Sequence, residues 1–152
     1  MSFTTVKKPV DLLLVEDNAA DAFLVRAFLS NSQLPNKLHQ VQDGEAAMAF
    51  LRQEEDYVGA PRPNLILLDL NLPKKDGREV LEELKADPDL QGIPVIIMTG
   101  SSAAQDILRS YELQASCYVT KPSDLDEFNR TMASLEDFWF NYVKLPKHPI
   151  KD

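Results

Sequence analysis

Four continuous apolar runs stand out along a chain whose other positions mix polar and hydrophobic residues. They are Leu12–Val15, Leu65–Leu68, Val95–Met98 and Cys117–Thr120. Short apolar runs without alternation are typical of buried strands in a parallel sheet, which helices cover on both faces. A less apolar segment, Lys37–Val41, predicts a fifth strand nearer an edge of that sheet.

The segments between these strands have the spacing of amphipathic helices. Asn18 can cap the first helix, with Asp21 three residues later, and Ser123 with Asp126 forms a capping box before the last. The helices expected on this basis span residues 18–31, 46–51, 76–86, 103–113 and a last stretch from 123 onward. Regular strand–helix alternation predicts an α/β fold, a doubly wound five-stranded parallel sheet in the order 2-1-3-4-5.

Length, charge and cysteine content narrow the class of protein. The 152 residues suit a single domain over 1–152, with a core at about 10–140 and a short C-terminal extension. The net charge of −8 argues against nucleic acid or an anionic membrane as the direct partner. Cys117 is the only cysteine and no apolar stretch is long enough to cross a bilayer, so we expect a cytoplasmic protein.

Polar residues follow each of the four apolar runs. Glu16-Asp17 follows the first run, Asp69 the second, Thr99 the third and Lys121 the last. The carboxyl ends of parallel strands meet at one edge of a sheet, where ligands bind. Each residue alone has an ordinary explanation as a helix cap or a turn residue. Capping and turn formation do not explain why all of these residues stand at strand ends.

The three carboxylates predict a divalent cation. Carboxylates about 5 Å apart repel by roughly 3 kcal/mol per pair at an effective dielectric near 20, so a cation is needed to keep them ionised together. Hard oxygen ligands suit Mg²⁺ or Mn²⁺ rather than zinc. With an ammonium and a hydroxyl beside them, these residues indicate a phosphoryl-transfer site.

This set of motifs resembles the receiver domain of two-component response regulators, over roughly residues 10–140. The residues that carry the resemblance are Glu16-Asp17, Asp69, Pro73, Asp76-Gly77, Thr99, Tyr118 and Lys121-Pro122. Within the family, Leu67–Leu81, the longer loop Gln53–Pro63 and the aromatic pair Phe138-Trp139 are similar to the small regulators paired with cyanobacterial phytochromes. Gln114 departs from the pattern, because many receivers have a helix-ending glycine there.

The resemblance implies a flavodoxin-like receiver that takes a phosphoryl group from a phosphohistidine of a sensor histidine kinase, here a phytochrome. Asp69 would be the phosphoacceptor, Lys121 would neutralise the phosphoryl oxygens, and the Lys121–Pro122 peptide would be cis. The cation would bind to Asp17, to Asp69 and to the backbone carbonyl of Asn71, and to Glu16 through water.

The resemblance also implies a conformational switch. Thr99 would bond a phosphoryl oxygen and draw its loop inward, and Tyr118 would turn into the space left behind. Asn71 and Ser101 lie at positions that tune how long the phosphoryl group survives in receivers. Such a protein is a signalling phosphoacceptor rather than an enzyme.

Other functions fit the sequence less well. A phosphatase of the haloacid-dehalogenase type needs a second Asp two residues after the nucleophile, where this chain has Asn71. The glycine spacing of a dinucleotide-binding turn is missing, and a DNA-binding regulator would need a longer chain. A receiver-like binding module that works without phosphorylation stays open as the alternative.

The C-terminal segment carries a surplus of aromatic residues. Leu125, Phe128, Met132, Leu135 and Trp139 form one helical stripe that predicts a core-facing side. Phe138, Phe140, Tyr142 and Val143 do not all fit on this stripe. Either the tail covers its own domain, or these residues form a homodimer through the faces of the fourth helix, fifth strand and fifth helix.

Overall fold

The computed structural model describes residues 9–32 and 34–142, with the side chains of 140–142 left out of the description. Five strands form one parallel sheet: β1 (Val10–Val15), β2 (Asn36–Val41), β3 (Leu65–Leu68), β4 (Val95–Thr99) and β5 (Cys117–Thr120). Their order is β2-β1-β3-β4-β5, which confirms the predicted topology. The apolar runs therefore mark the four strands β1, β3, β4 and β5 to within a few residues.

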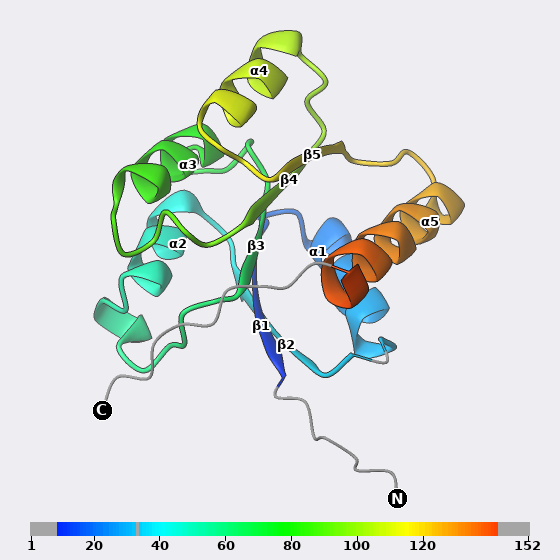
Figure 1. The fold of residues 1–152 in the computed structure, drawn as a ribbon, viewed down its shortest axis with the longest axis horizontal. Coiled ribbons are helices and arrows are strands. Elements are labelled where there is room, and N and C mark those ends of the chain that lie inside the picture. Colours follow the sequence, from blue (N-terminus) through cyan, green and yellow to red (C-terminus); the bar gives the residue numbers. More distant parts are fainter. Residues whose placement is uncertain (1–8, 33, 143–152) are drawn as a thin grey trace, which may run out of the picture.

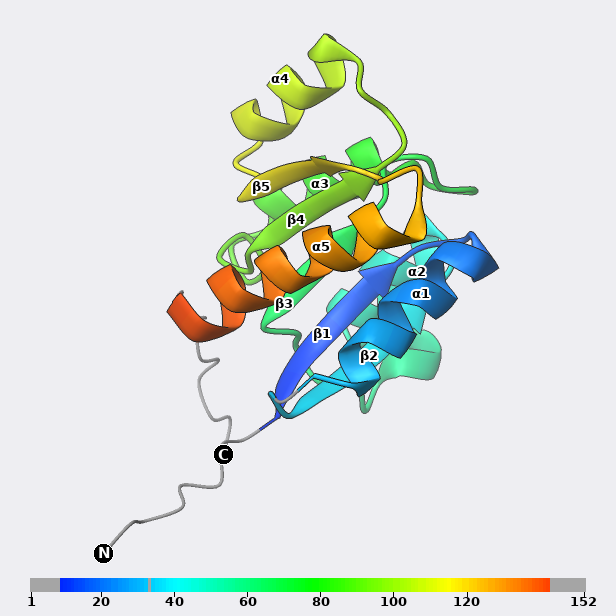
Figure 2. The same ribbon diagram turned by 90° about the vertical axis from the view of Figure 1, so that its right-hand side faces the viewer.

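Helices cover both faces of the sheet (Figures 1 and 2). They are α1 (Ala19–Ser30), α2 (Gly44–Leu51), α3 (Gly77–Ala86), α4 (Ala104–Glu112) and α5 (Leu125–Glu136). Helices α1 and α5 lie in front of the sheet in Figure 2, α2 and α3 lie behind it, and α4 lies beyond the β5 edge. The long loop before β3 contains one short 3₁₀ turn, Glu55–Tyr57, and α5 continues as a π-helix over Asp137–Tyr142.

Alternate residues of the strands feed two separate cores, because successive side chains of a strand point to opposite faces. Leu13 and Val15 pack with α2 and α3, whereas Leu12 and Leu14 pack with α1 and α5. All four side chains are almost completely buried. Because both faces of β1 are buried, its sequence is a continuous apolar run.

The predicted N-terminal cap is confirmed for α1 but not for α5. Asn18 caps α1 as predicted, since its side chain accepts a 3.0 Å hydrogen bond from the Asp21 amide. The predicted Ser123 cap of α5 is wrong: Asp124 takes that place and accepts a 2.7 Å bond from the Glu127 amide. Either residue type can cap a helix, and the sequence alone did not resolve a shift of one position.

The core-facing stripe of α5 is confirmed except at its first residue. Phe128, Met132 and Trp139 are buried against the α1 side of the sheet, and Leu135 packs partly against them. Leu125 is 56% exposed, contrary to prediction, because it is the first residue of the helix. Trp139 shows that the chain after α5 covers its own domain at that position.

Gln114 has a backbone φ of 65° just after α4 ends. This left-handed conformation is the one that glycine adopts most easily at the end of a helix. Gln114 thus adopts the backbone conformation that a helix-ending glycine would favour, although it has a side chain.

Candidate functional site

The strand ends bring the predicted site residues together at one edge of the sheet. Glu16 and Asp17 follow β1, Asp69 follows β3, Thr99 ends β4 and Lys121 follows β5. Backbone hydrogen bonds keep these ends in register, since the Asp69 amide donates to the Val15 carbonyl at 3.1 Å and the Lys121 amide to the Thr99 carbonyl at 2.7 Å. The parallel topology alone therefore gathers three carboxylates, a hydroxyl and an ammonium.

Asp69 is 5% exposed and receives hydrogen bonds on both carboxylate oxygens. The Thr99 hydroxyl donates to Oδ1 at 2.8 Å, the Asn71 amide donates to the same oxygen at 3.0 Å, and Lys121 Nζ donates to Oδ2 at 2.9 Å. Burial opposes ionisation, but these donors outweigh it and hold the pKa of Asp69 below its ordinary value. The carboxylate is therefore kept in its nucleophilic, ionised form.

Lys121 lies among three carboxylates. Its ammonium is 2.8 Å from Asp21 Oδ2 and 3.0 Å from Glu16, in addition to its contact with Asp69. Burial lowers the pKa of Lys121, but hydrogen bonds to Asp21, Asp69 and Glu16 more than compensate and raise it. The ammonium stays charged throughout the physiological pH range.

Glu16 is the most strongly perturbed carboxylate of the site. It is 3% exposed. Burial raises its pKa to about 7 against the hydrogen bond from Lys121, and the neighbouring charge of Asp69 raises it further. The single positive charge of Lys121 thus faces two buried carboxylates, Glu16 and Asp69, so this edge of the sheet can take up a further cation.

Glu16, Asp17 and Asp69 each offer a carboxylate oxygen, and these oxygens all lie within 4.8 Å of one another. Three hard oxygen donors at this separation can reach a single Mg²⁺ or Mn²⁺ ion. Glu16 and Asp69 are buried and Asp17 is exposed, so the cluster is open to solvent on one side. The residues present fit a divalent cation.

Asp21 is a site residue that sequence reasoning missed. The sequence pattern predicts only that it lies near the start of the first helix, yet its carboxylate contacts Lys121. The helix begins immediately beside the acidic pair, so its first turn faces the same sheet edge. The closeness of Asp21 to Glu16-Asp17 in the sequence was therefore the one feature that could have indicated its place in the site.

A close backbone approach holds the loop after β3. The Gly77 amide donates a 2.9 Å hydrogen bond to the Leu70 carbonyl, which closes the loop between Asp69 and α3. A Cβ atom on Gly77 would lie 2.6 Å from Leu70 Cα and would also strike the Asp69 carbonyl oxygen. Both obstacles are backbone atoms that also position the Asp69 side chain.

We therefore expect Gly77→Ala to destabilise the protein by about 3 kcal/mol, because the clash can be relieved only by moving the backbone. Urea unfolding of both proteins would measure the difference. Gly59→Ala is the matched control, since a Cβ there meets nothing within 4 Å, and it should change stability by less than about 0.5 kcal/mol. Equal stability changes in the two variants would contradict the close-approach explanation.

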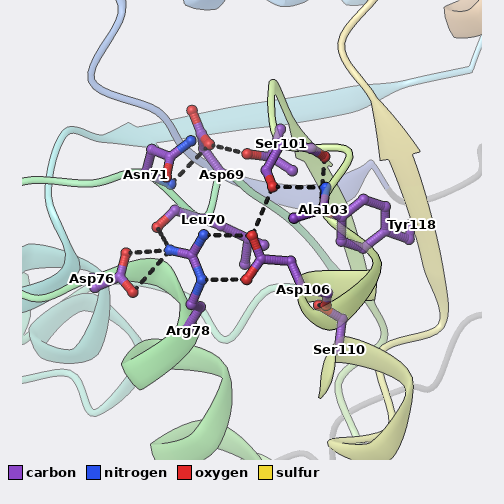
Figure 3. A network of polar contacts seen from close by, with 11 residues as sticks. Asp69, Leu70, Asn71, Asp76, Arg78, Ser101, Ala103, Asp106, Ser110 and Tyr118 are labelled. Atoms are coloured by element: carbon purple, nitrogen blue, oxygen red, sulfur yellow. Dashed lines mark hydrogen bonds and ion pairs between the residues drawn. The ribbon is translucent and has the colours of Figure 1, made fainter. Parts of the chain in front are cut away.

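The expected switch residues, Thr99 and Tyr118, also lie at the edge of the sheet where the site residues meet. Thr99 is fully buried and bonded to Asp69, as described above. The Tyr118 hydroxyl donates a 2.8 Å bond to the Ser101 carbonyl, two residues after Thr99. Both residues thus engage the loop between β4 and α4, which Figure 3 shows from close by.

The expected cis peptide is wrong, and most of the expected dimer residues have side chains outside the described residues. The Lys121–Pro122 peptide is not cis, because the described residues contain no cis peptide bond. Phe138 is 55% exposed, whereas the side chains of Phe140 and Tyr142, and all of Val143, lie outside the described residues.

Residues 12–133 match the family model of the response regulator receiver domain. The chain belongs to this family. Response regulator Rcp1 of Synechocystis sp. is 51% identical over 138 residues, which cover 91% of this chain and 94% of Rcp1. The crystal structure of Mn²⁺-bound Rcp1 matches with a TM-score of 0.89 at 50% identity, covering 91% of this chain and 100% of that chain. The phosphorylated cyanobacterial phytochrome response regulator RcpA matches with a TM-score of 0.89 at 48% identity, over 92% and 100% of the two chains.

These matches confirm the receiver fold and the family predicted from the strand-end motifs. The chain is a receiver of the response regulator type, a signalling protein whose relatives act through phosphorylation. The acidic cluster of Glu16, Asp17 and Asp69, together with the Mn²⁺-bound structure of Rcp1, fits a divalent-metal site. No helix among the described residues has the length and apolar character needed to cross a membrane.

Proposed function

We propose that Asp69 accepts a phosphoryl group from a phosphohistidine of a sensor histidine kinase and that this kinase is a phytochrome. The observation that carries the proposal is the set of donors around Asp69. Lys121, Thr99 and the Asn71 amide hold its carboxylate ionised at the open edge of the sheet. The similarity to RcpA, a phytochrome response regulator, supports the choice of kinase.

In the transfer step, an Asp69 oxygen attacks phosphorus while the bond from phosphorus to the imidazole nitrogen breaks and its electrons return to the imidazole. Lys121 neutralises charge on the phosphoryl oxygens, so catalysis is mainly electrostatic. Glu16, Asp17, Asp69 and the Asn71 carbonyl would hold Mg²⁺ or Mn²⁺, which supplies further positive charge to those oxygens when bound. The protein catalyses only its own phosphorylation and dephosphorylation.

The surroundings of Asp69 have space for a donor. A cavity of about 370 Å³ reaches Asp69 and Lys121 and is walled by apolar residues of α1 and α5, among them Leu24 and Phe128. This volume can admit a phosphorylated imidazole ring. Asn71 is exposed and Ser101 is partly exposed beside the acceptor, so both can meet an incoming water and tune the lifetime of the phosphoryl group.

The test uses the wild-type protein with acetyl phosphate and, separately, with phosphorylated phytochrome and non-phytochrome kinases. We expect one phosphoryl group per chain, seen by intact-mass spectrometry, only when Mg²⁺ is present, and faster transfer from the phytochrome kinase. No incorporation from any donor, together with retained binding to the kinase, would instead favour the phosphorylation-independent binding module. Equal transfer rates from all kinases would refute the phytochrome pairing.

We further propose that the protein forms a homodimer through the α4, β5 and α5 faces and works in the cytoplasm, with neither nucleic acid nor membrane as a direct partner. Two large apolar side chains are exposed on α4, Leu108 at 63% and Tyr111 at 50%. Phe138 follows α5 and is also exposed. Exposed apolar surface of this kind is typical of an association face.

Phe138→Asp should therefore convert a dimer into a monomer in sedimentation experiments, because a charge would be buried in the interface. A point substitution is preferable to truncation before residue 138, since Trp139 is buried in the core and its loss would damage the fold. Phe23→Asp is the control: Phe23 is 68% exposed, but on α1. A wild-type protein that sediments as a monomer, with and without phosphodonor, would rule out the dimer.

A further inference from the structure

A network of charged residues connects α3 to the loop between β4 and α4 (Figure 3). Arg78, in the first turn of α3, donates from Nε and Nη2 to the two carboxylate oxygens of Asp106, both at 2.7 Å. Its Nη1 donates to Asp76 at 3.0 Å and reaches the Leu70 carbonyl at 3.5 Å. A paired, parallel arrangement of this kind fixes both position and orientation.

The same carboxylate holds the loop that carries the switch. The Ser101 hydroxyl donates to Asp106 Oδ2 at 2.6 Å, and the Ser101 carbonyl accepts the bond from Tyr118. Two residues earlier, Thr99 is bonded to Asp69. The loop is therefore fixed at one end by the phosphoacceptor and at the other by Asp106.

Little else anchors α4. Its one buried residue is Ser110, whose hydroxyl bonds to the Asp106 carbonyl of the same helix at 2.7 Å. The side chains of Asp106 and Arg78 are 14% and 37% exposed, so solvent screens their attraction only in part. The hydrogen bonds from Arg78, and then from Ser101, lower the pKa of Asp106 to about 2, so the pair remains charged at any physiological pH.

We propose that Arg78 and Asp106 are positioning residues that hold Ser101, and with it Thr99 and Tyr118, in the arrangement needed for phosphorylation of Asp69. The proposal rests on the proposed function, in that Asp69 is the acceptor. Arg78 also contacts the Leu70 carbonyl, directly after Asp69, so the network closes a ring from the acceptor through α3 and α4 to Thr99. In this arrangement the Thr99 hydroxyl is hydrogen-bonded to Asp69. The Tyr118 hydroxyl is hydrogen-bonded to the Ser101 carbonyl in the loop between β4 and α4.

A purely structural role is the competing explanation, because an ion pair between two surface helices often adds little to stability and nothing to function. Arg109 provides the matched control on the same helix. It pairs with Glu82 at 3.9 Å and with Glu112 at 4.0 Å, and is 52% exposed. These contacts do not involve the loop.

The first measurement uses unphosphorylated protein and does not depend on the proposed function. In Asp106→Asn, amide hydrogen exchange at residues 101–112 should become about 10-fold faster, since a charged hydrogen-bond network of this kind is lost. The Tyr118 ring resonances should shift in the same variant. Arg109→Gln should leave both signals as in the wild type.

The second measurement is the rate of phosphorylation by acetyl phosphate at saturating Mg²⁺. Asp106→Asn should be about 10-fold slower than wild type, with its Mg²⁺ affinity unchanged. Arg78→Lys should also be slower, because lysine keeps the charge but not the paired geometry.

Unchanged amide exchange and an unchanged rate in Asp106→Asn would overturn the proposal. A rate equal to or above that of wild type, with faster exchange, would also overturn it, because the network would then restrain the loop without assisting phosphorylation. Equal slowing in Arg109→Gln would show a general effect of α4 charge. Wild-type protein that takes up no phosphoryl group would refute the proposed function, while the exchange measurement would still test the network.

Discussion

Asp69→Asn is expected to abolish phosphoryl incorporation while leaving the protein folded. An amide is not a nucleophile at phosphorus, so the loss should exceed the roughly 100-fold effect of removing one charge-stabilising donor. The side-chain oxygen of Asn can still accept from Thr99 and from the Asn71 amide, which now bond to Asp69 Oδ1. Intact-mass spectrometry after incubation with acetyl phosphate and Mg²⁺ is the measurement.

Asp21→Asn is the informative comparison. Asp21 contacts Lys121, as Asp69 does, but its side chain is partly exposed, and we do not propose it as the acceptor. Its loss should alter the rate without removing incorporation. Incorporation of a full phosphoryl group by the Asp69 variant would show that another residue accepts it.

Much of this site could be predicted from sequence because its residues depend on topology rather than on detailed packing. Parallel strands put their carboxyl ends at one edge, so a residue that directly follows an apolar run is placed without any knowledge of side-chain contacts. Glu16, Asp17, Asp69, Thr99 and Lys121 are all of this kind. Their convergence follows once the strand order is known.

The contacts that could not be predicted join separate elements through side chains. Arg78 and Asp106 are 28 residues apart on different helices, and no local pattern connects them. Periodicity indicated the helix at 103–113 but not that an ion pair to α3 would help to hold it. The same reason applies to Asp21, whose contact with Lys121 spans 100 residues of sequence.

Asp17→Asn should weaken Mg²⁺ binding by about 100-fold. The three oxygens of the acidic cluster lie within 4.8 Å of one another, so removing one full charge takes away a large part of the attraction for a cation among them. Unit charges about 4 Å apart interact by about 4 kcal/mol at an effective dielectric near 20, and each 1.4 kcal/mol is a factor of 10 in affinity. The amide oxygen that remains offsets part of this loss.

Calorimetric titration with MgCl₂ is the measurement, and Asp56→Asn is the control. Asp56 is exposed in the loop before β3, so its substitution makes the same change in net charge away from the cluster. Its Mg²⁺ affinity should match that of wild type. An unchanged affinity in the Asp17 variant would remove this residue from the metal site.

Lys121→Met should move the Mg²⁺ affinity in the opposite direction. The ammonium lies 3.0 Å from Glu16 and 2.9 Å from Asp69, two of the three carboxylates of the cluster, so it repels an arriving cation and partly neutralises the ligands. Methionine has a similar length and no charge, and its introduction should strengthen Mg²⁺ binding while slowing phosphorylation, because the phosphoryl oxygens lose a positive partner. A damaged site would weaken both properties. Opposite shifts in the Asp17 and Lys121 variants therefore identify the electrostatic balance among these four side chains as the determinant of metal affinity.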